Sequence, residues 1–469
     1  MADKQVALSV ESKGSASDEE EFTWTEEEEK ALVRRLDLLV MPLLIMGFFV
    51  LQLDRGNIGN ALTDFFLQDV GITQNQFNVG QQLLSLGIVL LEIPSNLVLY
   101  RVGPTLWIGS QILAWGLVAT FQAFQKGLGP FLVTRLLLGF CESGFIPAGL
   151  FTITRWYKRD ETSKRFAWYF LGNMTAGACS GIIAYGILHM RGVRGLAGWQ
   201  WLFIIEGVLT IAAGFVFITL FPKSPASPVT IFGYRYFSER ESQILQRRVT
   251  LDDPTKAEPR RTVSWAELKQ TLTNWKLLPH ILLTICGLAP GSTFMSYAPS
   301  LVVSFGFDRL QANAMTSDRI GARGPMVTLG LLLLWGATLG NRLLITSTDR
   351  NLRFAFITLS IAFSSNWHPT NGSWMALNAP TAGERSLTMA VLIMSANTAG
   401  IVGSQLFQQA DRPLYRTGWT VIVALVSLAL VASVAANAQY YFLNKRRRVR
   451  GSTTAAGDEE GEERRVYRP

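Results

Sequence analysis

The sequence is poor in charged residues and in the residues that build metal or catalytic sites. Only 17% of its 469 residues are charged, and it has three histidines and three cysteines. The histidines are scattered over positions 189, 280 and 368, and neither an HExxH nor a GxSxG pattern occurs. We therefore expect no enzyme, no catalytic residue, no metal and no cofactor. Each cysteine lies in an apolar run, so we expect free thiols.

Apolar residues are abundant instead. They make up 49% of the chain, and the mean hydropathy is +0.23, which is too high for an ordinary soluble protein. They lie in runs of about 18 to 26 residues, the length that an α-helix needs to cross a hydrocarbon core about 30 Å thick. We therefore predict an all-α, multi-pass integral membrane protein whose surroundings are the lipid bilayer.

Residues 1–35 are the exception to this pattern. They contain the acidic runs DEEEF and EEEEK and no apolar stretch. This composition excludes a cleaved signal peptide and predicts a disordered cytoplasmic tail.

The apolar runs divide the rest of the chain into two parts. Residues 36–221 hold six expected spans and residues 277–443 hold five, with a polar middle loop at 222–276 and a charged tail at 444–469. The middle loop carries ten Lys or Arg residues, which makes it cytoplasmic by the positive-inside rule. That rule also explains the net charge of +8, so we expect no nucleic acid partner. The expected spans are 38–62, 79–100, 105–125, 130–154, 166–188, 201–221, 277–307, 326–340, 353–378, 386–407 and 418–443.

Five spans in the second part are one too few for this topology. With a cytoplasmic start, an odd total would place the basic run KRRRVR outside the cell, against the charge rule. We therefore expect a missing or irregular span in the second part.

Five spaced motifs carry a family resemblance. The chain resembles the fungal allantoate permease-like branch of the anion:cation symporter family, within the major facilitator superfamily, over about residues 36–443. The motifs are LDRGNIGNAL (53–62), EIPSNLVLYRVGPTLWI (92–108), RLLLGFCESGFIPA (135–148), RWYKRDETSKR (155–165) and GWQWLFIIEG (198–207).

The resemblance implies the major facilitator fold, with two six-helix halves, a substrate site at the midplane between them, and transport by alternating access. The segment SDRIGARG is similar to the family's cytoplasmic loop between helices eight and nine. In that loop we expect Asp318, Arg319 and Arg323 to have structural or gating roles.

The resemblance also locates the missing span. Family members carry about twenty apolar residues, one span, ahead of that loop, whereas here Met315 is followed at once by Thr316 and Ser317. We therefore expect helix eight to be absent between Met315 and Ser317, through a gene-model, splicing or genuine deletion event.

Ionisable residues inside apolar spans are costly, so each is a candidate functional residue. Asp54 and Arg55 are neighbours, and an acid beside a cation could exchange a proton against an anionic substrate; a structural ion pair is the alternative. Arg135 and Glu142 are seven residues apart, so they share one helix face. Burial favours the protonated form of Glu142. The resemblance implies proton coupling by Asp54 and Glu142 and substrate binding by Arg55 and Arg135, against a silent salt bridge.

Four further residues are candidates for functional roles on less evidence. Glu92 and Glu206 lie beside Pro or Gly near the ends of spans, so we expect structural or gating roles. Tyr297 and Asn397 are candidates to line the substrate cavity, with interhelical hydrogen bonding as the alternative.

The sequence thus predicts a monomeric, proton-coupled symporter of a small anion, in the plasma membrane. The resemblance points to sulfate or a sulfonate, or to a carboxylate such as nicotinate, pantothenate or allantoate. The alternative is a non-transporting or misfolded variant or sensor of the same family, because one helix is missing.

Overall fold

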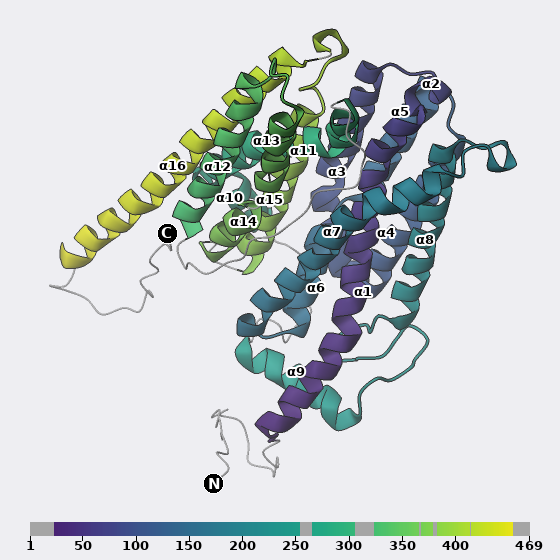
Figure 1. Ribbon diagram of the computed structural model, residues 1–469. Coiled ribbons are helices and arrows are strands. Elements are labelled where there is room, and N and C mark those ends of the chain that lie inside the picture. The colour runs from purple at the N-terminus through teal and green to yellow at the C-terminus, as the bar shows by residue number, and fades with distance from the viewer. Residues whose placement is uncertain are drawn as a thin grey trace, which may run out of the picture.

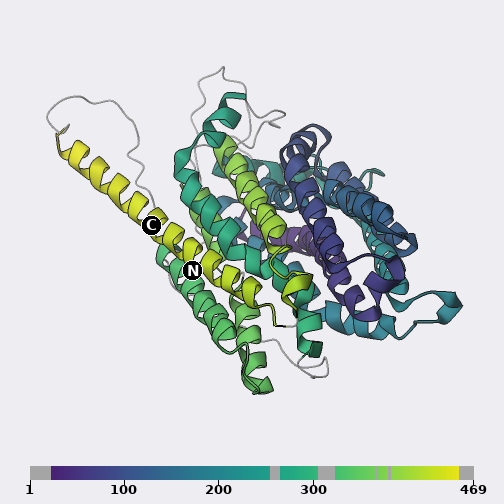
Figure 2. The same ribbon diagram turned by 90° about the horizontal axis from the view of Figure 1, so that it is seen from above.

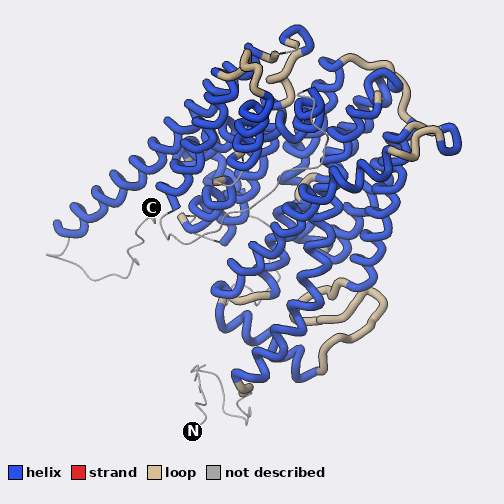
Figure 3. Tube along the Cα trace, in the orientation of Figure 1, coloured by secondary structure: helices blue, strands red, loops and turns tan. Residues whose placement is uncertain are grey.

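Helices account for all the regular structure that can be seen. The computed structural model describes residues 23–253, 265–304, 323–364, 367–378, 382–412 and 414–453. In these ranges every regular element is a helix, apart from isolated bridges (Figures 1 and 3). The predicted all-α fold is confirmed.

The helices form two groups separated by α9 (Glu239–Asp252). The first group is α1 (Glu26–Ala61), α2 (Phe66–Val70), α3 (Gln74–Val102), α4 (Pro104–Phe121), α5 (Leu128–Glu142), α6 (Phe145–Trp156), α7 (Arg159–Leu188) and α8 (Gly198–Leu220). The second group is α10 (Trp265–Leu272), α11 (Leu278–Ser304), α12 (Arg323–Leu343), α13 (Arg350–Phe363), α14 (His368–Leu377), α15 (Ala382–Gly403) and α16 (Arg416–Thr453).

Each of the eleven expected spans has a counterpart among these helices. Within the described ranges, nine helical segments are long and apolar enough to cross a membrane. Two shorter apolar helices, Asn351–Phe363 and Leu387–Gly403, bring the total to the predicted eleven.

The first helix begins earlier than the sequence suggested. Thr25 caps α1: its hydroxyl accepts from the backbone N–H of Glu28, whose carboxylate accepts from the N–H of Thr25. Four glutamates fill the first turn, where the helix dipole favours negative charge. The tail predicted over residues 1–35 is therefore wrong from Glu26 onward, because the acidic run builds a helix N-terminus. At about 1.5 Å per residue, this 36-residue helix is longer than a bilayer core is thick.

Close packing fixes the orientation of α8 in the first group. At Gly207, a Cβ atom would lie 2.3 Å from the Thr120 hydroxyl of α4, so only glycine allows this contact. Thr210 lies one turn further along α8 on an adjacent side of the helix, where its hydroxyl meets Asp54 of α1.

Two successive helices of the second group run in the same direction. Thr328, Trp335 and Arg342 of α12 bond to Ser433, Ser427 and Thr420 of α16, so the two helices are antiparallel. Helix α11 is also antiparallel to α16, since His280 meets Tyr440 and Phe294 packs on Trp419.

Helices α11 and α12 are therefore parallel, and Ser304 and Arg323 lie at opposite ends of the bundle with 18 residues between them in the sequence. The predicted gap between Met315 and Ser317 falls among those residues, outside the described ranges.

The two groups form halves that lie side by side (Figure 2). One end of the bundle carries α2 and the turn before α16, and the other carries α9 and the start of α1 (Figure 1). We call the first the outer face and the second the inner face, because the basic connections cluster at the second.

Candidate substrate and proton site

A break in the fourth span positions the central carboxylate. The sequence predicted one helix over 130–154, but α5 ends at Glu142 and α6 restarts at Phe145. Gly144 turns the chain with a φ of 77°, a left-handed conformation that favours glycine. The Glu92 carboxylate accepts from the N–H of Gly144 at 2.9 Å, and Ser95 donates to the Ser143 carbonyl at 2.7 Å. Glu142 therefore projects from a helix end that α3 holds in place.

Glu142 forms an ion pair with Arg55 of α1. Arg55 Nε lies 2.6 Å from Glu142 Oε2. The Glu142 side chain is fully buried, whereas 23% of the Arg55 side chain is exposed. The second carboxylate oxygen, Oε1, is buried and has no hydrogen-bond partner among the described residues. The pair thus joins a buried carboxylate, Glu142, to a partly exposed guanidinium, Arg55.

Asp54 does not share this pair, although it precedes Arg55 in the sequence. Consecutive residues point about 100° apart around an α-helix, and Asp54 faces α8 instead. Its Oδ2 accepts from the Thr210 hydroxyl at 2.9 Å. Its Oδ1 is buried without a hydrogen-bond partner in the described part of the chain, beside the Trp115 indole.

Arg135 is a buried cation whose hydrogen bonds are incomplete. It lies two turns before Glu142 on α5 and is 1% exposed. Nε and Nη2 have no hydrogen-bond partner among the described residues, and the guanidinium lies 5.7 Å from the centre of the Phe131 ring. Unpaired buried charge is costly, so these N–H groups are free to bind the oxygens of an anion.

Glu206 lies deeper in the first half than its sequence position suggested. It is 1% exposed, and neither carboxylate oxygen has a hydrogen-bond partner in the described ranges. Its polar neighbour is Asn57, one turn along α1 from Asp54.

The second half contributes less to the site that can be described. Asn397 bonds back to the Ile393 carbonyl of its own helix at 2.9 Å. Tyr297 lies in α11, and Arg323 begins α12, but their side chains are outside the described set. Asp318 and Arg319 fall outside the described residues altogether.

Sequence reasoning missed a neutral polar network in the second half. His280 Nδ1 lies 2.7 Å from Asn371 Oδ1, and His280 Nε2 lies 3.2 Å from the Tyr440 hydroxyl. The Asn371 amide donates to Thr284, which donates to the His280 carbonyl. His280 and Asn371 were visible as polar residues in apolar runs, but nothing in the sequence pairs residues from three helices.

Hydrogen bonds join the halves at the outer face. Gln74 and Asn78 of α3 both donate to the Phe407 carbonyl, at 3.1 and 3.2 Å. One turn further, Gln82 donates to the Ile401 carbonyl at 3.2 Å. We call these three side chains the amide ladder. It ties α3 to the end of α15 and closes the outer side of the bundle.

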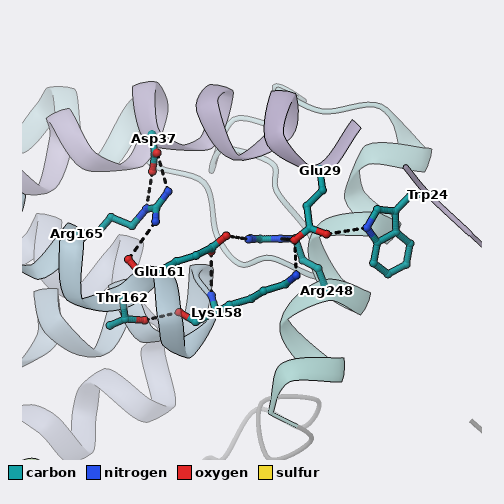
Figure 4. Close-up of polar contacts among 8 residues, drawn as sticks. All are labelled: Trp24, Glu29, Asp37, Lys158, Glu161, Thr162, Arg165 and Arg248. Atoms are coloured by element: carbon teal, nitrogen blue, oxygen red, sulfur yellow. Dashed lines mark hydrogen bonds and ion pairs between the residues drawn. The ribbon is translucent and has the colours of Figure 1, made fainter. Parts of the chain in front are cut away.

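An ionic cluster fastens α9 to the inner face of the first half (Figure 4). Arg248 is fully buried and bridges Glu29 of α1, at 3.0 Å, and Glu161 of α7. Lys158 also pairs with Glu29. Helix α9 of the middle loop is therefore bound to the first half by ion pairs.

A second pair on this face joins α1 to α7. The Arg165 guanidinium donates two hydrogen bonds to the Asp37 carboxylate, at 2.8 and 2.7 Å (Figure 4). Burial, together with the nearby Asp37 charge, raises the pKa of the Tyr157 hydroxyl, which lies between two spans. Tyr157 is therefore a neutral packing partner of this pair.

Comparison with known proteins agrees with this architecture. The family model described as "Major Facilitator Superfamily" matches residues 44–316. The chain is 29% identical to the uncharacterized transporter YIL166C of Saccharomyces cerevisiae, covering 91% of this chain and 82% of that one. It is 28% identical to the MFS-type transporter cnsO of Penicillium expansum, covering 91% and 86%.

Both alignments contain more positions than this chain supplies. The yeast alignment has 448 positions but takes in 91% of 469 residues, about 427, which leaves about 21 positions with no residue here. The family match itself stops at residue 316. About 21 residues is the length of one membrane span. That this span is missing between Met315 and Ser317 stays a prediction.

Among solved structures, the inward-open xylose transporter XylE from E. coli superposes with a TM-score of 0.63 at 14% identity, covering 85% of this chain and 95% of that one. A bacterial homologue of the lysosomal transporter Spinster, inward-facing, gives a TM-score of 0.57 at 12% identity, covering 85% and 95%. At these identities the likeness concerns the fold. The family match covers more than half of the sequence, and the chain belongs to the major facilitator superfamily of membrane transporters.

Proposed function

We propose that this transporter is a proton-coupled symporter that carries a small anion by alternating access. The observation that carries the proposal is the Arg55–Glu142 pair, with the incompletely bonded Arg135 guanidinium on the same helix as Glu142. The cargo we infer is sulfate or a sulfonate, or a carboxylate such as nicotinate, pantothenate or allantoate.

The pair couples the two ions by competition for one cation. When a proton binds the unpartnered oxygen Glu142 Oε1, the carboxyl becomes neutral and its attraction to Arg55 falls. Arg55, which is part-exposed, then binds an anion together with the free N–H groups of Arg135. When Glu142 loses the proton at the inner face, it reclaims Arg55 and the anion is released.

Asp54 is the second proton carrier in this proposal. Its Oδ2 is held by Thr210, while Oδ1 is left free to accept a proton. Because Asp54 is buried against α8 and not paired with Arg55, its protonation does not compete directly with anion binding.

Opening and closing of the outer face requires the amide ladder to break and re-form. Each of its bonds contributes on the order of 1 kcal/mol, which is small enough for ligand binding to overcome. The relatives are named as transporters, and nothing in the comparisons favours the alternative of a non-transporting variant.

The test is uptake of radiolabelled sulfate, taurine, nicotinate, pantothenate and allantoate by yeast cells that express a tagged copy, with and without a protonophore. A tagged copy also shows whether the protein reaches the plasma membrane as a monomer. We expect one anion to accumulate only while the proton gradient is intact. A version with helix eight restored is measured beside it.

Variants assign the roles. Glu142→Gln and Asp54→Asn should lose accumulation while retaining exchange of labelled for unlabelled anion across the membrane. Unchanged accumulation in both variants would refute the proton assignment, and absence of uptake for every anion in both chain versions would refute the anion assignment.

A further inference from the structure

The interface between α1 and α8 contains two polar levels. The helices are antiparallel, since Asp64 bonds to Trp199 at one end and Asp54 to Thr210 nearer the middle. Asn57 and Glu206 form the next level, one turn from Asp54 and Thr210 on each helix. One helical turn is about 5.4 Å, so the Glu206 carboxyl is a near neighbour of Asp54.

Acceptors outnumber donors in this interface. Asp54 Oδ1, Asn57 Oδ1 and both oxygens of Glu206 are buried and lack hydrogen-bond partners among the described residues. Arg55 forms its ion pair with Glu142 and not with these groups. Two carboxylates without a cation are very costly in an apolar interior, so Glu206 and Asp54 are stable here when they carry protons.

The outer end of this interface is sealed in the present conformation. Phe66, Trp199 and Phe203 pack edge to face above it, with ring centres 5.0 and 6.2 Å from that of Phe66. A proton on Glu206 is therefore separated from the outer solution, and the neighbouring carboxyl along the interface, beyond the Asn57 amide, is that of Asp54.

We propose that Glu206 is a third proton-carrying carboxyl, which passes its proton to Asp54 during the transport cycle. Asp54 first releases its own proton toward the inner side. The O–H bond on Glu206 then breaks as a new O–H bond forms on Asp54 Oδ1, and Glu206 is reprotonated from the outer solution when that face opens. This inference rests on the proposed proton coupling, and it adds a carrier inside the first half, away from the anion.

The test compares wild type, Glu206→Gln, Glu206→Asp and the control Glu384→Gln, all as full chains in liposomes. Glu384 is also a buried glutamate, but it lies in α15 of the second half, away from the α1–α8 interface. Infrared difference spectra between acid and alkaline buffer report carboxylic acid C=O bands without any substrate. Uptake of the anion that wild type accumulates is measured across a pH series.

We expect Glu206→Gln to lose one carboxylic acid band and to move the half-maximal pH of uptake by about one unit or more, and Glu206→Asp to restore both in part. Glu384→Gln should keep the wild-type pH profile. A Glu206→Gln protein that keeps every band and the wild-type profile, while Glu142→Gln loses coupling, would overturn the inference. If the band is lost but wild type shows no proton-dependent uptake, Glu206 holds a proton and the proposed symport is wrong.

Discussion

The buried ionisable side chains of the first half differ from the buried network around His280 in the second half. In the spans of the first half, Arg135, Glu142 and Glu206 are buried with polar atoms that find no partner in the described structure. In the second half, His280 and Asn371 are buried equally deeply but use their side-chain hydrogen bonds within one closed circuit. Unsatisfied groups cost stability, whereas satisfied groups contribute to it.

This difference separates binding chemistry from scaffold. In the circuit, Thr284 donates to a carbonyl and accepts from Asn371, so Asn371 Oδ1 must accept from His280 Nδ1. Nε2 is then the acceptor for Tyr440, and the imidazole is neutral. The network is therefore a neutral, fully bonded part of the interior of the second half.

The strongest test of the comparison is Arg135→Gln. Charge-assisted hydrogen bonds contribute about 1.5 to 3 kcal/mol, so anion uptake should fall by about 10- to 150-fold. The melting temperature should stay the same or rise, because an incompletely bonded buried cation is removed. Uptake assays and thermal melting in detergent measure the two effects.

Arg165→Gln is the matched control for Arg135→Gln. Its guanidinium is fully paired with Asp37 at the inner face. The expected pattern reverses: lower melting temperature with uptake per folded molecule near that of wild type. Equal effects of the two variants on uptake would remove the distinction between paired and unpaired cations.

In the second half, Asn371→Ala should do the opposite of Arg135→Gln. It leaves His280 Nδ1 and Thr284 without their partner, which costs about 1 to 3 kcal/mol of folding free energy. Uptake normalised to the monodisperse fraction in size-exclusion chromatography should be unchanged. Weakened anion uptake at normal stability would place this network in the substrate site.

Gly144→Ala asks whether the charges of the first half depend on one turn. A left-handed residue costs about 1 to 2 kcal/mol when it is not glycine, and the added Cβ would lie 2.3 Å from the Ser95 hydroxyl. We expect a lower melting temperature together with weaker proton coupling, because Glu142 moves with the turn. Gly177→Ala, where the Cβ would meet no atom within 4 Å, is the control and should resemble wild type.

The smallest expected effect concerns the contact between the halves. Removing one bond of the amide ladder with Asn78→Ala should shift the balance toward an open outer face by about fivefold, given about 1 kcal/mol per bond. Spin labels at the exposed outer positions Gln68 and Ala410 report the change as a longer distance population. An unchanged distance distribution would show that the ladder follows the movement without resisting it.

The sequence predicted the membrane helices, but it did not predict which side chains of different helices contact one another. Span length and hydropathy predicted eleven membrane helices because each such helix must satisfy its own backbone. They did not predict that Asp54 faces Thr210 while Arg55 faces Glu142, because this depends on how α1 is rotated relative to α5 and α8. The break after Glu142 was also missed, although Ser143-Gly144 marks it, because apolar residues continue on both sides.

The amide ladder is chemically one-sided. Its donors are the side chains of Gln74, Asn78 and Gln82, but its acceptors are the backbone carbonyls of Phe407 and Ile401. Every amino acid at positions 401 and 407 supplies the same carbonyl, whereas a single codon change on α3 deletes a donor. In a saturation mutagenesis library, variants that loosen the outer closure through the ladder should therefore map to α3. At position 407 the constraint is on the buried ring, which packs on Tyr415 and Trp419, and not on the carbonyl.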